Sequence, residues 1–423
     1  MMESKDRIKA SLNHESTDQL AVDFGATPVT GIHVLAIQNL REFFDLEERP
    51  IKVTEPYQML GEIEEDLSEI LGIDTVGISP RNTMFGFPNE NFKEFKTPWK
   101  QVVLVPGQFN VSFTDAGDVL MYPEGDLSIE PCAKMPVNGF FFDALIRQKP
   151  IEEGKLDPMD NLEEFNEISD LDLNHFKREV DKYSNSGKAI VANFGGTAIG
   201  DIALVPGLNL KKPKGIRDVT EWYMSTVMRT DYIHEIFSKQ TEIAVSNLKK
   251  IFSLVGKQVD VAFICGTDFG TQDSQFCSQD TFLSLYTPYY KQINDWIHQN
   301  TTWKTFKHSC GAVEPFMKHF IEAGFDIINP VQTNAAGMDP QQLKDKYGNS
   351  LVFWGGGVDT QRVFPFGTQK EIENQVLNHC EIFSKNGGYV FNTIHNLQAN
   401  VPLENIIAML RAIDKFNGKP TRF

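Results

Sequence analysis

The chain has 423 residues, 41% hydrophobic and 23% charged, and can bury a large core without disulfides or structural metals. Its formal net charge of −17 disfavours phosphate backbones and anionic lipids, so neither nucleic acid nor membrane is an expected partner. No apolar run approaches the roughly 20 residues that cross a bilayer. Five scattered cysteines and a polar N-terminal segment without an apolar signal core predict a cytoplasmic protein.

Short apolar runs alternate with longer helical patterns along most of the chain. Their β-branched and aromatic residues suit parallel strands that are buried on both faces. The runs are residues 20–25, 73–79, 189–194, 259–265, 303–308, 325–330, 351–355 and 388–393. Eight such strands separated by helices predict the α/β fold class, as one (β/α)8 TIM-type barrel domain over residues 1–423. An open, doubly wound sheet is the alternative.

Residues 82–148 do not follow this alternation. Turn signals such as TDAGD and YPEGD separate short alternating runs such as QVVLV and FNVSF. This pattern predicts an antiparallel β meander inserted between strands 2 and 3. The insertion either forms a lid or wall of the substrate pocket or only stabilises the barrel.

The strongest candidate for chemistry is the segment Lys307-His308-Ser309-Cys310-Gly311, which closes the fifth strand. Residues two apart on a strand point to the same face, so His308 and Cys310 should project together. Imidazole nitrogen and thiolate sulfur are ligands that zinc prefers, and the carboxyl ends of strands carry the active sites of barrel enzymes. Ordinary packing of the two side chains is the alternative.

A third candidate metal ligand, His395, follows the last strand at the same rim. Three ligands would leave zinc one open position, which is typical of a catalytic site. His308 and His395 stand on strands that are not neighbours, so the loops must bend inward to bring them together. A free acid or base, or a substrate-binding histidine, is the alternative role of His395.

Other rim residues are candidates for catalysis or binding. Asp268 follows the fourth strand and could orient a zinc ligand, ligate the metal or accept a proton, or only cap the next helix. Gly356, in a triple glycine after the seventh strand, permits close approach to a bulky ligand. Asp359, Gln361 and Asn396 offer hydrogen bonds to a substrate or cofactor.

With these residues in hand, the chain resembles the uroporphyrinogen decarboxylase superfamily, and within it the zinc- and corrinoid-dependent methyltransferase branch of the methylcobalamin:coenzyme M methyltransferase type. The segments that carry the resemblance are PYYKQINDWIH (288–298), KHSCGAVEPFMKHFIEAGFDIINPVQ (307–332), FWGGGVDTQ (353–361) and HNLQANVPLENI (395–406), together with the N-terminal DRIKASLNHESTDQLAVDFG.

The resemblance implies a distorted TIM barrel with its site at the carboxyl ends of the strands. In the methyltransferase branch, His-x-Cys supplies two zinc ligands and a late cysteine the third; here His308 and Cys310 match, and His395 lies at or beside the place of the missing cysteine. His395 also matches a histidine that the metal-free decarboxylases carry. The arginine-rich segment with which decarboxylases clamp the porphyrinogen is absent.

The resemblance therefore implies an enzyme that transfers a methyl group between a corrinoid, held by a carrier protein, and a thiol or methoxylated small molecule, with zinc as cofactor. The alternative is a metal-free carboxy-lyase of the uroporphyrinogen decarboxylase type, acting in porphyrin biosynthesis. The oligomeric state does not follow from these patterns.

Overall fold

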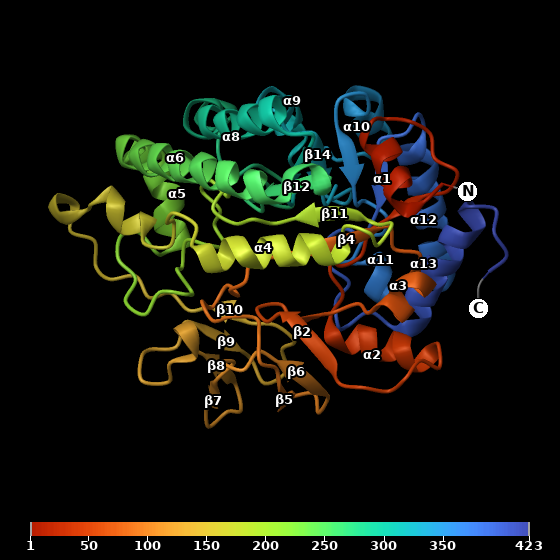
Figure 1. The fold of residues 1–423 in the computed structure, drawn as a ribbon, viewed down its shortest axis with the longest axis horizontal. Coiled ribbons are helices and arrows are strands. Elements are labelled where there is room, and N and C mark those ends of the chain that lie inside the picture. Colours follow the sequence, from red (N-terminus) through yellow and green to blue (C-terminus); the bar gives the residue numbers. More distant parts are fainter. Residues whose placement is uncertain (1, 422–423) are drawn as a thin grey trace.

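An eight-stranded parallel sheet organises the computed structural model, which describes residues 2–421 (Figure 1). Within the sheet, adjacent strands are hydrogen-bonded in the order β1, β16, β15, β14, β13, β12, β11, β4. At the two ends of this order, the N–H of Asp74 donates to the carbonyl of Val22 at 2.9 Å, so the barrel is nearly closed. The strands are β1 (Ala21–Val22), β4 (Thr75–Ile78), β11 (Ala189–Ala192), β12 (Val261–Cys265), β13 (Lys304–His308), β14 (Ile327–Asn329), β15 (Val352–Trp354) and β16 (Tyr389–Phe391).

Each of these strands falls inside one of the eight predicted runs, so the predicted α/β barrel is confirmed and the open-sheet alternative is wrong. The runs form strands because the strand residues are almost all buried on both faces, between the barrel interior and the helices outside.

Helices cover the outside of the barrel. They are α1 (Ser4–Leu12), α2 (Val34–Phe43), α3 (Glu65–Leu71), α4 (Asp170–Tyr183), α5 (Val219–Met228), α6 (Thr230–Val255), α7 (Gln279–Thr281), α8 (Thr287–Asn300), α9 (Met317–Glu322), α10 (Pro340–Tyr347), α11 (Val363–Phe366), α12 (Gln369–Ser384) and α13 (Leu403–Phe416). Local signals set their starts: a capping box between Thr368 and Glu371 opens α12, and the Ser169 side chain caps α4. Within residues 2–421, none of them combines the length and apolarity that crossing a bilayer requires.

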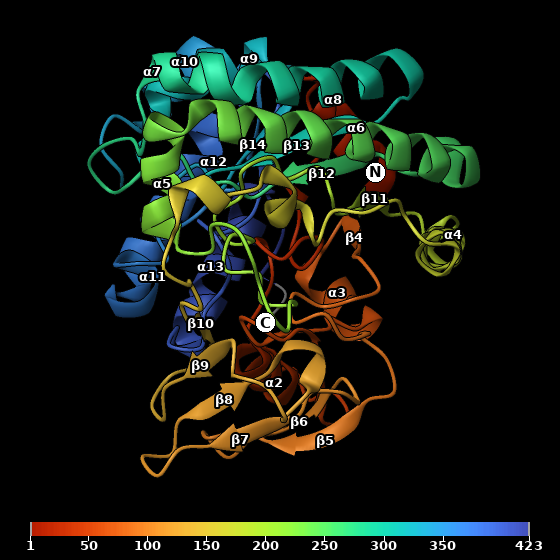
Figure 2. The ribbon, with the colours of Figure 1, turned by 90° about the vertical axis from the view of Figure 1, so that its left-hand side faces the viewer.

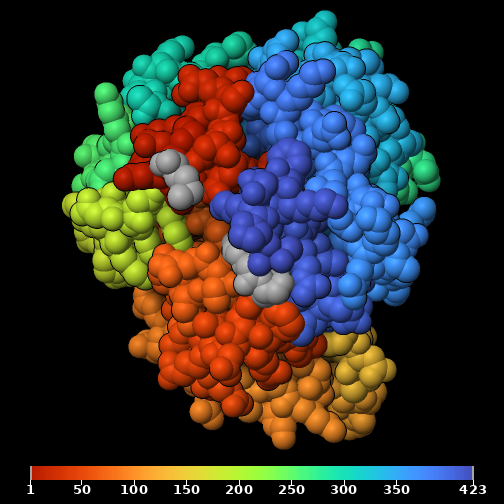
Figure 3. All heavy atoms as spheres, turned by 90° about the vertical axis from the view of Figure 1, so that its right-hand side faces the viewer, coloured from red at the N-terminus to blue at the C-terminus, as the bar shows by residue number. Residues whose placement is uncertain are grey.

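The first helix closes the barrel at the amino ends of its strands. The N–H of Lys5 donates to the carbonyl of Gly187, just before β11. Ile8 and Leu12 of α1 pack into the apolar cluster that fills the barrel, which also includes Phe263, Phe306 and Trp354. The N- and C-terminal regions lie side by side on this face (Figure 3), where the N–H of Leu20 donates to Asn417 Oδ1. The opposite end of the barrel is therefore left for the loops at the carboxyl ends of the strands.

Two small sheets lie beside the barrel (Figure 2). One combines β2 (Ile51–Glu55), β3 (Leu60–Gly61), β5 (Lys93–Lys96) and β6 (Val102–Val105); the other combines β7 (Val111–Phe113), β8 (Val119–Met121), β9 (Ala133–Met135) and β10 (Asp143–Ala144).

The single antiparallel meander predicted for residues 82–148 is not confirmed. Its first part, β5 and β6, joins strands that precede the second barrel strand, and β2 pairs with β6 in parallel. Only β7 to β10 form an antiparallel sheet of their own. The pairing of Ile51 with Val103 joins segments far apart in the chain, which turn signals alone do not reveal.

Candidate metal centre

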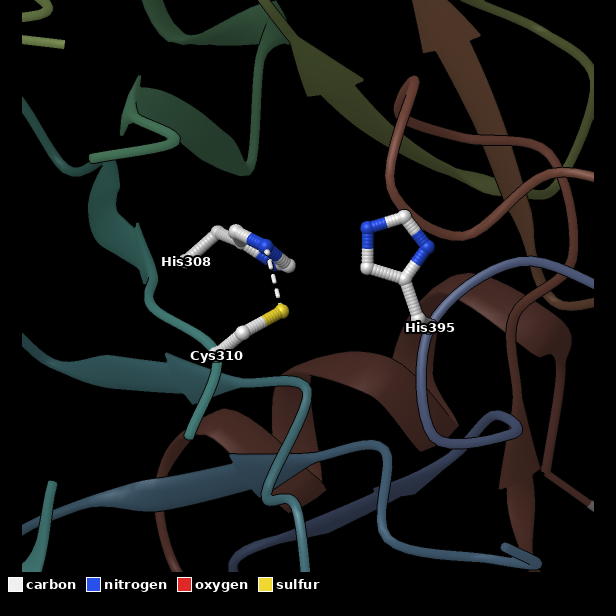
Figure 4. A group of neighbouring side chains, drawn as sticks. All are labelled: His308, Cys310 and His395. Carbon is white, nitrogen blue, oxygen red and sulfur yellow. Dashed lines mark hydrogen bonds between the residues drawn. The ribbon is translucent and has the colours of Figure 1, made fainter. Parts of the chain in front are cut away.

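Three potential metal ligands meet at the carboxyl ends of the barrel strands. His308 is the last residue of β13, Cys310 follows it by two positions, and His395 stands in the turn after β16. One ligand atom from each lies within 4.8 Å of the others. Figure 4 shows His308 and His395 facing one another, with the Cys310 sulfur beside the His308 ring. The loops do bend inward, as a centre built from non-neighbouring strands requires.

His308 is held with one nitrogen ready to bind a metal. The amide of Asn329 donates through Nδ2 to the carbonyl of Trp354 at 2.7 Å, so its Oδ1 faces His308 and accepts the Nδ1 proton at 2.5 Å. His308 Nε2 therefore carries the lone pair. Burial lowers the pKa of His308 to about 4, which keeps the ring neutral near pH 7.

The thiol of Cys310 lies 3.3 Å from His308 Nε2, and its backbone N–H donates to Asp268 Oδ1 at 2.7 Å. Burial, followed by the nearby Asp268 carboxyl, raises the pKa of the Cys310 thiol well above its usual range. A thiolate at this position therefore needs a cation beside it, which a divalent metal would supply.

His395, the third donor, has an unusual backbone conformation and a tautomer that does not present a lone pair to the centre. Its backbone has φ +72°, a left-handed conformation rare for a residue with a Cβ. The N–H of Asn396 donates to His395 Nδ1 at 2.8 Å, so the neutral ring carries its proton on Nε2, the nitrogen that faces the other two donors. Burial, then the neighbouring His308, lowers the pKa of His395 to about 3.

Asp268 lies against the centre from the loop after β12. Its Oδ1 is 3.6 Å from His308 Nε2, and its side chain is 31% exposed. Burial raises the pKa of this carboxyl above its usual value. A partly accessible carboxyl beside a thiol and two imidazoles can accept or return a proton during a reaction.

The remaining predicted binding residues make contacts within the protein. Asp359 Oδ1 accepts from the N–H groups of Gln361 and Arg362 and from the amide of Asn334, which also donates to Gln361. Asn396 uses its amide on Gly31, Pro28 and Gln58. The carbonyl of Gly356 contacts the His379 ring.

Asn329 was missed in the sequence. A weak signal existed, because it is the polar residue that ends the apolar run of the neighbouring strand. The barrel register pairs it with His308, and that register gives it its role.

The donors fit a zinc ion by their chemistry and spacing. Zn–N bonds of about 2.0–2.1 Å and Zn–S bonds of about 2.3 Å place two donors of a tetrahedral site roughly 3.5 Å apart. The 3.3 Å between His308 Nε2 and Cys310 Sγ matches this spacing. His395 lies close enough to complete the set, but its proton would first have to move from Nε2 to Nδ1, which now accepts the N–H of Asn396.

Residues 210–416 match the model of the uroporphyrinogen decarboxylase (URO-D) family. This stretch contains His308, Cys310 and His395, together with Asp268. The resemblance drawn from the motifs is therefore confirmed, and this part of the chain is a URO-D family domain. No curated protein sequence matches the chain significantly.

Among solved structures, the chain is similar to a methyltransferase from Methanosarcina mazei, with 16% sequence identity and a TM-score of 0.54. The similarity covers 98% of this chain and 99% of that one, so the two share one fold from end to end. A GH113 β-1,4-mannanase (9% identity, 59% and 80% covered, TM-score 0.30) and an Ignisphaera aggregans GH53 catalytic domain (11% identity, 92% and 99% covered, TM-score 0.31) are much less similar.

Proposed function

We propose that the protein is a zinc-dependent methyltransferase that moves a methyl group between a corrinoid on a carrier protein and a thiol or methoxylated small molecule. The observation that carries the proposal is the pair His308 and Cys310, whose donor atoms lie 3.3 Å apart with the imidazole in the ligating tautomer. The fold shared with a solved methyltransferase supports it.

His308 and Cys310 would hold the ion, and His395 would complete the set. When bound, zinc supplies Lewis acidity that lowers the pKa of a coordinated thiol or polarises a coordinated oxygen. Asp268, the partly exposed carboxyl of the centre, would accept the proton that a substrate thiol loses. When a thiol is the methyl acceptor, a C–S bond would form, the Co–C bond of the methylated corrinoid would break, and its electron pair would stay on cobalt. The carbonyl of Trp354, through Asn329, keeps the His308 ring oriented throughout.

Metal content tests the ligand assignment. We expect purified protein to hold about one zinc per chain, and Cys310→Ala to lose it. Cys277→Ala, at another half-buried cysteine, is the matched control and should keep the metal. Consumption of methylcobalamin in the presence of a thiol then measures methyl transfer. Zinc that survives Cys310→Ala in full amount would contradict the proposed ligands.

A second candidate function is metal-free decarboxylation of the URO-D type. The observation that favours it is the proton on His395 Nε2, which points into the centre and could be delivered to a carbanion after CO2 leaves. Turnover of uroporphyrinogen by chelator-treated protein, lost in His395→Gln, would establish this function instead.

A further inference from the structure

Lys307 is a buried cation with an unusual environment. Its side chain is fully buried, and its ammonium donates to two backbone carbonyls, those of Thr267 at 2.6 Å and His308 at 2.5 Å. Lysines are almost never fully buried unless they are paired, and here the carboxyls of Asp201 and Asp268 interact with the ammonium only at a distance. The cost of burying this charge therefore calls for an explanation.

Three aromatic rings surround the ammonium. Nζ lies 5.0 Å from the ring centroid of Phe269, 5.6 Å from that of Phe320 and 6.0 Å from that of Tyr290. The faces of aromatic rings attract a cation, most strongly where water is excluded. The Tyr290 hydroxyl also lies 3.1 Å from Thr267 Oγ1. The aromatic cage thus offsets part of the desolvation cost and fixes where the ammonium sits.

The two carbonyls that Lys307 binds belong to the two segments that build the candidate metal centre. Thr267 immediately precedes Asp268 in one segment, and His308 is a proposed ligand in the other. Two further hydrogen bonds join the same segments: Cys310 N–H to Asp268 Oδ1 at 2.7 Å and Phe269 N–H to Ser309 Oγ at 2.9 Å.

The backbones of the two segments also touch. A Cβ on Gly311 would lie 2.3 Å from the carbonyl carbon of Gly270, so only glycine permits this approach. The ammonium of Lys307 lies at one end of this junction and the two glycines at the other.

From this arrangement we infer that Lys307 is a positioning residue of the metal centre: it clamps the loop 266–270 against the end of β13 and so fixes Asp268 relative to His308 and Cys310. The inference rests on the proposed function for the metal, whereas the clamp itself concerns only the protein. Partners that orient metal ligands typically contribute about 10–100-fold to metal affinity.

The experiment compares Lys307→Met with Lys344→Met. Lys344 is also a buried lysine, with Nζ on the carbonyl of Gly387 at 2.6 Å and 5.9 Å from the Phe353 ring, but it lies at the opposite end of the strands. Both substitutions keep an unbranched chain and remove the charge. The loss of stability that comes only from removing a buried ammonium should therefore be similar in the two variants.

Two readouts are measured on full-length protein. The first is Co²⁺ binding, by affinity and by the visible d–d absorption that reports ligand geometry; Lys307→Met should bind about 10-fold or more weakly with an altered spectrum. The second is hydrogen exchange of metal-free protein; Lys307→Met should exchange faster in residues 266–272. Lys344→Met should leave both unchanged.

The outcomes separate the clamp from the proposed function. Unchanged exchange in residues 266–272 of Lys307→Met overturns the clamp, whether or not the protein binds Co²⁺. Wild-type protein that binds no Co²⁺ counts against the metal centre, and the exchange result then decides the clamp alone. If Lys307→Met does not fold, Lys307→Gln, which keeps a neutral N–H donor group, should show intermediate exchange; wild-type exchange in it overturns the clamp.

Discussion

Asn329 determines which nitrogen of His308 faces Cys310, because its amide orientation is fixed by the carbonyl of Trp354. Replacing Asn329 by alanine leaves the His308 ring free to turn and to change tautomer. We expect Asn329→Ala to weaken zinc binding about 10–100-fold, measured by competition with a chromophoric chelator.

The control is Asn405→Ala, another buried asparagine, which donates to the carbonyl of Phe364 away from the centre. It should lose stability without losing zinc affinity. Equal zinc affinity in Asn329→Ala and wild type would show that His308 does not depend on this contact.

At the residue scale, the sequence predicted the candidate centre in part. His308 and Cys310 could be found because residues two apart on a strand share a face, although β13 ends at His308 and Cys310 lies in the loop just beyond it. Asn329 and Lys307 could not be given roles, because the first depends on the register between β13 and β14 and the second on which carbonyls lie under the strand end. The proton position on His395 follows from the backbone of the turn, which no residue pattern specifies.

At the scale of elements, His33 joins α2 to the β insertion. It is the N-cap of α2 and accepts the N–H of Leu35 through Nδ1, while Nε2 donates to the carbonyl of Phe140. His33 is fully buried, and burial lowers its pKa to about 4 from an ordinary value of 6.5. The folded protein thus holds this ring neutral, whereas the unfolded chain protonates it below pH 6.5.

Because the unfolded state binds more protons between pH 6.5 and pH 4, His33 lowers the free energy of unfolding as pH falls through this window. The loss that His33 causes between pH 6.5 and pH 5 is about 2 kcal/mol. In urea unfolding, His33→Gln should lose less stability than wild type over that interval. A parallel response of His33→Gln and wild type would refute the assignment.

Helix α1 contributes side chains to the barrel interior at the end opposite the candidate centre. Ile8 is fully buried in the cluster of Phe306 and Trp354. We expect Ile8→Ala to lower the free energy of unfolding by about 2–5 kcal/mol, because it leaves a cavity. Zinc affinity should be unchanged; a large loss of affinity would mean that the two ends of the barrel are coupled. Ile146→Ala, at an exposed position, should change stability by less than about 0.5 kcal/mol.

The barrel strands were predictable because each is buried on both faces and therefore appears as an apolar run. The two small sheets were not, since their strands are short and partly exposed and their pairing joins residues some fifty positions apart. Local patterns show that such strands exist, but they do not determine their partners.

At the scale of the whole molecule, the candidate centre and the core are separate. The three donors lie at the rim, while the apolar clusters fill the barrel and the layer between strands and helices. Removing the metal with a chelator should therefore leave the far-ultraviolet circular dichroism and cooperative unfolding intact, and abolish methyl transfer. Collapse of the helical signal on chelation would mean that the ion is structural.

The contact between Gly270 and Gly311 restricts how this centre can change over time. Neither position has room for a methyl group, so a saturation library should recover only glycine at both when metal binding is selected. New specificity at this barrel mouth must then come from side chains on surrounding loops, while the contact between the two backbone segments beneath them stays the same. The part of the molecule closest to the chemistry would thus be its least variable, for lack of space and not because those two residues take part in any reaction.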